Sequence, residues 1–136
     1  MNDKVFLDTN ILVYLYSEDE QSKRYMAYEF VNNYNCITST QTLNEASNVW
    51  FKKHSLGTSQ IFKYLDEIES VCDDVALIQR RTINIALSIK ERYGFSYYDC
   101  LIISSALENG CTIVLTEDMN GNQFINSKLR IVNPFI

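Results

Sequence analysis

Short β-rich runs alternate with longer segments of helical periodicity along the whole chain, and this alternation limits the folds it can adopt. Apolar, largely β-branched runs occupy residues 5–7, 36–38 and 111–115. Between them, in segments such as 19–34 and 80–93, apolar residues recur at the three- and four-residue intervals of an amphipathic helix. Strands separated by helices pair in parallel, because each connection crosses over the sheet. We therefore expect a three-layer α/β/α fold with a central, mainly parallel sheet of about four to five strands.

The same patterns place the remaining elements. Strands are expected at 74–77 and 129–132, and helices after Ser39 or Thr40, at about 59–71 and at 97–108. The chain has 136 residues, of which 46% are hydrophobic, so it can bury one sizeable core but not two. We expect a single domain spanning residues 1–136.

The location of the protein is predicted from what the sequence lacks. No apolar stretch approaches the roughly 20 residues that span a bilayer. The chain enters a strand-like segment within four residues of Met1, without the pattern of a signal peptide. Four cysteines are spaced like neither a zinc knuckle nor a redox pair, which favours reduced, buried thiols: Cys36, Cys72, Cys100 and Cys111. We expect a cytoplasmic protein with no membrane contact.

Carboxylates are the main candidates for chemistry in this chain. His54 is the only histidine, it follows two lysines at an expected helix end, and no serine or cysteine has a motif that would make it a catalytic base. The formal charge of −5 argues against a broad basic surface for nucleic acid. That objection weakens if four acids belong to a metal site, because the rest of the chain then carries about −1 and divalent ions reverse the local charge.

Four segments carry acids where strands end or ordered helices begin. Asp8 follows the first strand, Glu45 and Asp99 lie in early turns of helices, and the pair Glu117 and Asp118 follows the run at 111–115. Ligands of parallel sheets bind beyond the carboxyl ends of the strands, so these acids lie where a site would be. Each also has a structural alternative as a helix cap or as a partner of a helix dipole.

Taken in order, these segments resemble the four motifs of the PIN-domain family, in particular the bacterial toxins of the VapC type. The matching stretches are Leu7-Asp8-Thr9-Asn10-Ile11-Leu12, Asn44-Glu45, Tyr98-Asp99-Cys100-Leu101-Ile102 and Thr116-Glu117-Asp118-Met119. The resemblance spans nearly the whole chain. It implies a small Mg²⁺-dependent endoribonuclease, with Mn²⁺ as a possible substitute, whose metal-binding and catalytic residues are Asp8, Glu45, Asp99 and Asp118.

This resemblance is consistent with the chemistry of the residues. Mg²⁺ prefers carboxylate oxygens and needs few protein ligands, because water and substrate phosphate supply the rest. Thr9, Asn10 and Thr116 are expected to donate hydrogen bonds that fix the orientation of the carboxylates, and helix capping is their alternative role. The resemblance further implies an RNA substrate, an antitoxin protein that covers the acidic cleft, and a homodimer.

The fourth motif departs from the commonest family pattern. An aspartate–phenylalanine pair usually follows shortly, whereas residues 120–124 read Asn-Gly-Asn-Gln-Phe. Glu117 and Asp118 are adjacent, so only one can point into a cleft, and we favour Asp118. Candidate substrate contacts are basic residues for phosphates and tyrosines for stacking on bases: Lys52, Lys53, Lys63, Arg80, Arg81, Tyr97 and Tyr98.

Alternatives remain at this stage. A non-catalytic PIN-like module that binds protein or RNA would use the same acids only as caps and loop residues. A receiver-like or phosphatase-like domain would use one aspartate as a phosphoryl acceptor beside a lysine that the sequence does not place. The motifs are shared by toxins and RNA-processing enzymes, and by sites with one or two metal ions.

Overall fold

One six-stranded sheet forms the centre of the protein. The computed structural model describes residues 3–119 and 121–136. Within these residues the strand order is β3-β2-β1-β4-β6-β5, and every neighbouring pair is parallel except β5 with β6. The strands are β1 Lys4–Leu7, β2 Asn35–Ser39, β3 Asp74–Ala76, β4 Ile113–Leu115, β5 Phe124–Ile125 and β6 Leu129–Val132. The mainly parallel sheet is confirmed, and it exceeds the expected count by β5, which is two residues long.

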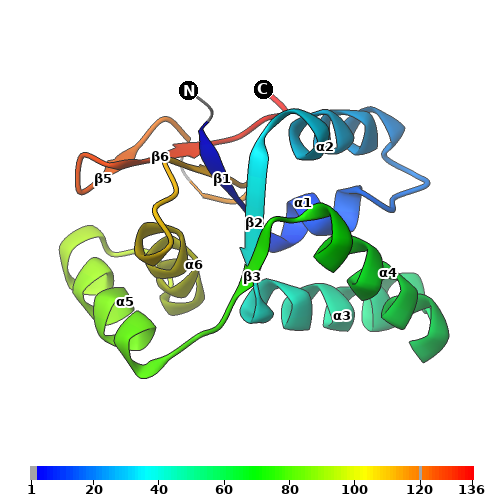
Figure 1. Ribbon diagram of the computed structural model, residues 1–136, viewed down its shortest axis with the longest axis horizontal. Helices are drawn as coiled ribbons and strands as arrows, with labels where there is room; N and C mark the ends of the chain where they lie inside the picture. Colours follow the sequence, from blue (N-terminus) through cyan, green and yellow to red (C-terminus); the bar gives the residue numbers. More distant parts are fainter. Residues whose placement is uncertain (1–2, 120) are drawn as a thin grey trace.

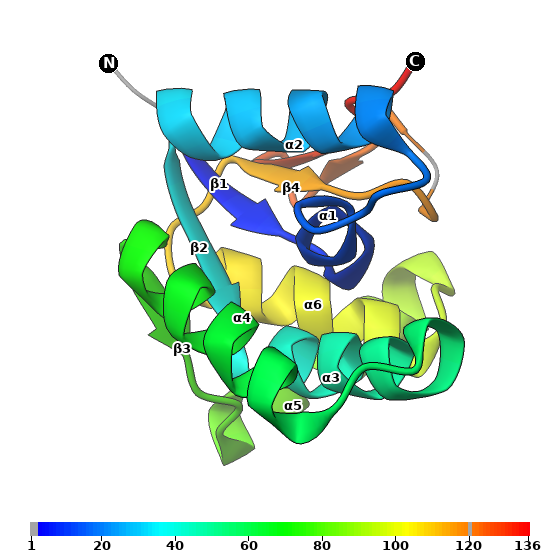
Figure 2. The same cartoon turned by 90° about the vertical axis from the view of Figure 1, so that its right-hand side faces the viewer.

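Helices cover both faces of this sheet, which confirms the three-layer arrangement (Figure 1). Helices α1 to α4 pack on one face, and α5 and α6 pack on the other, as the view turned by 90° also shows (Figure 2). Their bounds are α1 Thr9–Tyr14, α2 Gln21–Asn33, α3 Thr40–His54, α4 Thr58–Val71, α5 Arg80–Tyr93 and α6 Tyr97–Glu108. In the described part of the chain, no helix is both long and apolar enough to cross a membrane.

Strand β1 shows why the two layers form. Its side chains alternate across the sheet, so Val5 and Leu7 enter the core beneath α1 to α4 while Phe6 enters the core beneath α5 and α6. All three are fully buried. A strand that is apolar on both faces needs helices on both faces, because either face would otherwise leave apolar surface in water. The four cysteines are likewise buried and form no disulfide.

Capping residues fix where the acid-bearing helices begin. Ser39 forms a capping box with Thr42 at the start of α3, and the Ser96 hydroxyl accepts a hydrogen bond from the Asp99 amide at the start of α6. Gly94 ends α5 with a φ of +77°, a conformation that glycine adopts without a Cβ clash. The cap at Ser96 therefore places Asp99 in the first turn of α6.

The strand order creates a crevice between β1 and β4. From β1 the chain continues to β2 and β3 on one side, whereas β4 is followed by β6 on the other side. Leu7 pairs with Leu115, and the Asp8 amide donates a hydrogen bond of 3.0 Å to the Leu115 carbonyl. At such a reversal of strand order the connections leave in opposite directions, which opens a space beyond the carboxyl ends of the strands.

The central strand should dominate stability. Replacing the fully buried Phe6 by Ala should lower the free energy of unfolding by about 3–5 kcal/mol, because a large cavity opens beneath α5 and α6. The same change at Phe62, which is 69% exposed on α4, should alter it by no more than about 0.5 kcal/mol. Urea denaturation of both variants measures the difference, and equal losses would contradict this description of the core.

Candidate active site

The acids singled out from the sequence line one cleft. It has a volume of about 550 Å³ and lies where β1 and β4 end. Its lining includes five carboxylates, contributed by the end of β1, by α3, by α6 and by the segment after β4: Asp8, Glu45, Asp99, Glu117 and Asp118. Residues up to 110 positions apart in the chain are thus brought to one side of the sheet.

Asp8 is both a helix cap and a cleft residue. Its carboxylate accepts hydrogen bonds of 2.7 Å from the Thr9 amide and 2.7 Å from the Thr116 hydroxyl, and only 4% of the residue is exposed. Asp8 itself is the N-cap of α1, so Thr9 and Asn10 do not cap this helix. Burial raises its pKa to about 6, the two hydrogen bonds oppose that rise, and the charges of Asp99 and Glu45 add to it.

Glu45 and Asp99 are half-buried, and each feels the negative charge of another carboxylate in the cleft. Burial raises the pKa of Glu45, a hydrogen bond of 2.8 Å from Gln41 lowers it, and the charge of Asp99 raises it further. The pKa of Asp99 is raised by burial and by the charge of Asp118, against a lowering hydrogen bond with Ser96. Each carboxylate thus makes ionisation of another harder, which is the behaviour of acids gathered without a cation.

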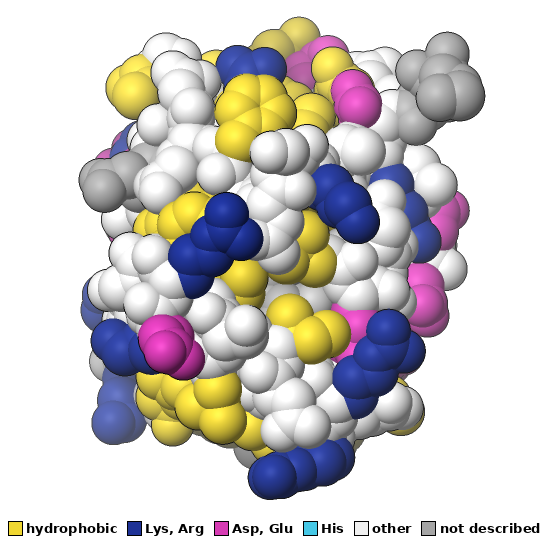
Figure 3. Space-filling view, turned by 90° about the vertical axis from the view of Figure 1, so that its left-hand side faces the viewer, with side chains coloured by type: hydrophobic (Ala, Val, Ile, Leu, Met, Phe, Trp, Pro, Cys, Tyr) yellow, Lys and Arg dark blue, Asp and Glu magenta, His cyan; other side chains and the backbone are white. Residues whose placement is uncertain are grey.

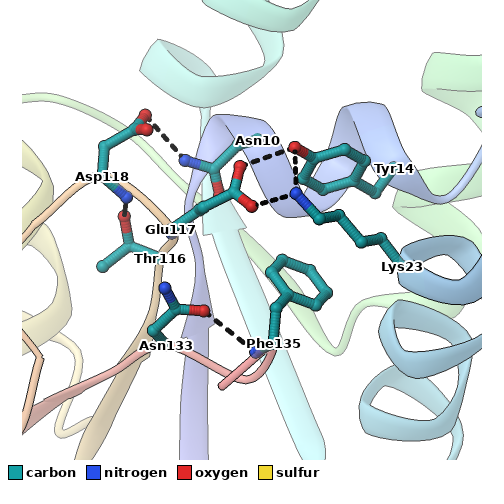
Figure 4. A network of polar contacts seen from close by, with 8 residues as sticks. All are labelled: Asn10, Tyr14, Lys23, Thr116, Glu117, Asp118, Asn133 and Phe135. Carbon is teal, nitrogen blue, oxygen red and sulfur yellow. Dashed lines mark hydrogen bonds and ion pairs between the residues drawn. The ribbon is translucent and has the colours of Figure 1, made fainter. Parts of the chain in front are cut away.

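Glu117 and Asp118 point in different directions (Figure 4). The Asp118 carboxylate accepts a hydrogen bond of 2.8 Å from the Asn10 amide group, and its backbone amide donates to Thr116. The Glu117 carboxylate forms an ion pair with Lys23 and accepts a hydrogen bond of 2.5 Å from the Tyr14 hydroxyl. Of the two adjacent acids, Glu117 has a compensating cation, whereas no Lys or Arg in the described residues lies within ion-pair distance of Asp118.

The lining suits a hard divalent cation. Carboxylate oxygens are the donors that Mg²⁺ and Mn²⁺ prefer, and the buried Thr9 hydroxyl, which also lines the cleft, has no hydrogen-bond partner among the residues that the structure describes. Across residues 3–119 and 121–136, however, no three His, Cys, Asp or Glu side chains lie close enough to hold an ion together. The arrangement therefore suits an ion held by few carboxylates, with water and substrate phosphate as its other ligands.

Helix α3 adds residues that the sequence motifs did not single out as a group. Asn48, Val49 and Lys53 share the cleft with Glu45, because positions three, four and eight residues apart lie along one side of a helix, and His54 at the helix end borders it too. Lys53 was one of several candidate phosphate contacts, and the others, Lys52, Lys63, Arg80 and Arg81, do not line the cleft. His54 is exposed at the last position of α3, as expected, but it also borders the cleft.

Two further residues near the site escaped sequence reasoning. Tyr14 lies four positions after Asn10 on α1, so a shared helix face was a signal that could have found it. Lys23 comes from α2 and gave no signal, because its partner Glu117 is 94 positions away. Of the three residues expected to hold the carboxylates, Asn10 and Thr116 do donate side-chain hydrogen bonds to the acids, whereas the Thr9 hydroxyl has no partner in the described part of the chain.

Comparison with known proteins places this geometry in a family. Residues 5–123 match the PIN domain family. A comparison with curated protein sequences finds no match.

Solved structures share the fold at low sequence identity. A toxin–antitoxin complex from Klebsiella pneumoniae is similar with a TM-score of 0.71 and 19% identity, covering 96% of this chain and 98% of that one. VapC20 of Mycobacterium tuberculosis, described as a toxin that cleaves the sarcin-ricin loop, gives 0.65 and 15%, covering 81% and 86%. VapBC2 of Rickettsia felis, bound to a promoter DNA fragment, gives 0.60 and 19%, covering 85% and 88%.

The burial of Asp8 predicts a pH-dependent stability. Its folded pKa of about 6 exceeds the ordinary value of 3.8, so the folded state binds the proton more tightly than the unfolded chain, and stability falls as pH rises from about 3.8 to about 6 and stays at the lower value above that. In EDTA, Asp8→Asn should therefore raise the free energy of unfolding at pH 7.5 by up to ~3 kcal/mol and leave it unchanged at pH 4.

Urea denaturation at both pH values, beside the exposed Asp66→Asn as a control, measures this effect. A variant that is no more stable than the wild type at pH 7.5 would show that Asp8 is not destabilising.

Proposed function

This chain belongs to the PIN domain family, and from that premise we propose that it is a metal-dependent endoribonuclease formed by one domain over residues 1–136. The observation that carries the proposal is the meeting of four separate acidic segments in one cleft beyond β1 and β4. Support also comes from the similar structures, which include a toxin described as cleaving the sarcin-ricin loop.

The proposed direct metal ligands are Asp8 and Asp99, with Glu45 and Asp118 contacting the ion or its water ligands. A bound Mg²⁺ or Mn²⁺ would lower the pKa of a water molecule and offset charge on the phosphodiester oxygens. Thr116 and the Thr9 amide hold the Asp8 carboxylate in place, and Gln41 holds that of Glu45. Such hydrogen bonds set the orientation of carboxylate ligands and so the affinity of a metal site.

Substrate contacts would come from the rim of the cleft. Lys53 lines the cleft near the end of α3, where its ammonium group can bind a phosphate. Tyr98 is 64% exposed beside Asp99, so its ring is free to stack on an unpaired base. On the face shown in Figure 3, lysine and arginine side chains are spread among the acids, so this part of the surface carries cations despite the net charge of −5.

We assign the chain the role of the toxin in a type II toxin–antitoxin pair, with an antitoxin protein as its partner and a homodimer as its own state. Two similar structures support this assignment, a toxin–antitoxin complex and VapBC2. Mass measurement of the protein alone and with the product of an adjacent small gene tests both states. A monomer that binds no such product would redirect the assignment to RNA processing.

One observation favours the alternative of a non-catalytic binding module. Asp8 does serve as the N-cap of α1, which is a purely structural role. Capping, however, does not account for Glu45, Asp99 and Asp118 lining the same cleft, where the charge of Asp99 raises the pKa of Glu45 and the charge of Asp118 raises the pKa of Asp99. The phosphoryl-acceptor alternative is not supported, because the family match spans residues 5–123.

Removal of one acid should abolish the reaction. Purified protein should cut total RNA in Mg²⁺ or Mn²⁺ and not in EDTA, and Asp99→Asn should reduce the rate roughly a hundredfold or more by removing a metal ligand. The exposed Asp66→Asn on α4 loses the same charge away from the cleft and should cut at the wild-type rate. If Asp99→Asn is folded and cuts as fast as the wild type, the assignment of Asp99 fails, and if the wild type never cuts, the binding module is favoured.

Lys53 should affect binding of the substrate more than the chemical step. Lys53→Ala should raise KM for single-stranded RNA by roughly three- to tenfold and reduce the slope of log affinity against log salt by about 0.7, because one phosphate contact is lost. Lys63→Ala, an exposed position on α4 outside the cleft, is the matched control. Steady-state cleavage measures KM and fluorescence anisotropy at several KCl concentrations measures the salt slope, and equal slopes for the two variants would exclude Lys53 as a phosphate contact.

A further inference from the structure

Lys23 lies at a junction of four segments that are distant in the chain. Figure 4 shows it reaching from α2 toward Glu117, which follows β4, beside Tyr14 of α1 and Phe135 near the C-terminus. Its ammonium group pairs with Glu117 and donates to the Tyr14 hydroxyl at 3.2 Å. It also lies 4.9 Å from the centre of the Tyr14 ring and 5.4 Å from that of Phe135.

These contacts give Glu117 a different environment from its neighbour. Both oxygens of its carboxylate are used, one by Tyr14 and the other by Lys23. Its backbone amide donates to the Asn10 side chain at 3.2 Å, and the same Asn10 side chain donates to Asp118. One asparagine therefore holds the backbone of Glu117 and the carboxylate of Asp118, and Lys23 turns the Glu117 carboxylate to the other side.

The ion pair of Lys23 and Glu117 is partly buried. The side chains of Lys23 and Glu117 are 29% and 26% exposed, and the aromatic rings of Tyr14 and Phe135 cover the ammonium group. Partial burial reduces screening by water and salt, so such a pair is held more firmly than one at an open surface. Burial opposes ionisation of Glu117, but the hydrogen bonds from Lys23 and Tyr14 lower its pKa overall, so its charge persists at neutral pH.

Without Lys23, that charge would be free to act in the cleft. Glu117 lines the same cleft as the four proposed metal-site acids. A released carboxylate there would attract a divalent cation and would repel the phosphates of RNA. Lys23 is therefore placed to control which of two adjacent acids serves the site.

We propose that Lys23 is a positioning residue, which neutralises Glu117 and keeps its carboxylate out of the metal site so that Asp118 is the fourth acid. The inference rests on the proposed metal-dependent nuclease site, to which it adds a selection between Glu117 and Asp118. Lys23 itself touches neither metal nor substrate in this scheme.

For Lys23→Met, the proposal predicts tighter metal binding together with poorer RNA cleavage. Mn²⁺ should bind roughly three- to tenfold more tightly, because the cleft loses a cation and gains a free carboxylate. KM for RNA should rise and kcat should fall, because that carboxylate would occupy the position of a substrate phosphate and repel it. Adding Glu117→Gln to the variant should reverse both changes, and Lys23→Arg should resemble the wild type.

Calorimetric titration with Mn²⁺ and steady-state RNA cleavage measure these effects, with the exposed Lys63→Met as the matched control and thermal unfolding to verify folding. Unchanged or weaker Mn²⁺ binding in folded Lys23→Met overturns the proposal, as does failure of the double variant to reverse the change. Glu117→Gln alone should leave Mn²⁺ binding near that of the wild type, and a loss as large as that of Asp118→Asn would make Glu117 the ligand. Because Mn²⁺ affinity is read without RNA, the role of Lys23 can fail or hold separately from the nuclease activity.

Discussion

The parallel pairing of β1 with β4 is the contact on which both the core and the acidic cleft depend. Its register sets Leu7 beside Leu115, so the first residues after the two strands are neighbours, and the Thr116 hydroxyl donates a hydrogen bond to the Asp8 carboxylate. Because these strands belong to opposite halves of the sheet order, their connections diverge and leave the cleft open. A shift of register by one residue would reverse which side chains face each core and would separate Asp8 from Thr116.

The cleft is electrostatically unfavourable in the absence of a cation. Burial and the neighbouring charges raise the pKa values of Asp8, Glu45 and Asp99 together. A domain whose acids served only as caps would gain stability by separating them, since like charges at short distance oppose ionisation. Such a loss of folding free energy is typical of functional sites, where residues are arranged for function rather than for stability. The hydrogen bonds of Thr116 and Gln41 to the Asp8 and Glu45 carboxylates, and that of the Ser96 side chain to Asp99, reduce that loss without removing it.

Much of this arrangement could be predicted from the sequence, because its signals are local. The apolar periodicity of 80–93 and the glycine at 94 predicted α5, the apolar periodicity of 97–108 predicted α6, and the run at 129–132 predicted β6. The site acids were found through their order along the chain and its resemblance to a family. Strand β5 was missed because two residues carry no periodicity. Lys23 was missed because an ion pair across 94 residues depends on how α2 packs, which no local pattern records.

The distribution of cations explains how an acidic chain can be suited to an anionic substrate. Five carboxylates line the cleft. Two lysines near them differ in what they contact, because Lys53 lines the cleft and Lys23 pairs with Glu117. Lys53 is exposed and lines the cleft, so its charge is available to a phosphate. Lys23 pairs with Glu117 and lies beside two aromatic rings, so its charge is balanced by that acid and is not available to a phosphate. Under our proposal, Glu117 is neutralised in this way and a divalent cation is left to the four acids that the family resemblance selects, so that cation rather than the protein surface would supply the positive charge that RNA meets.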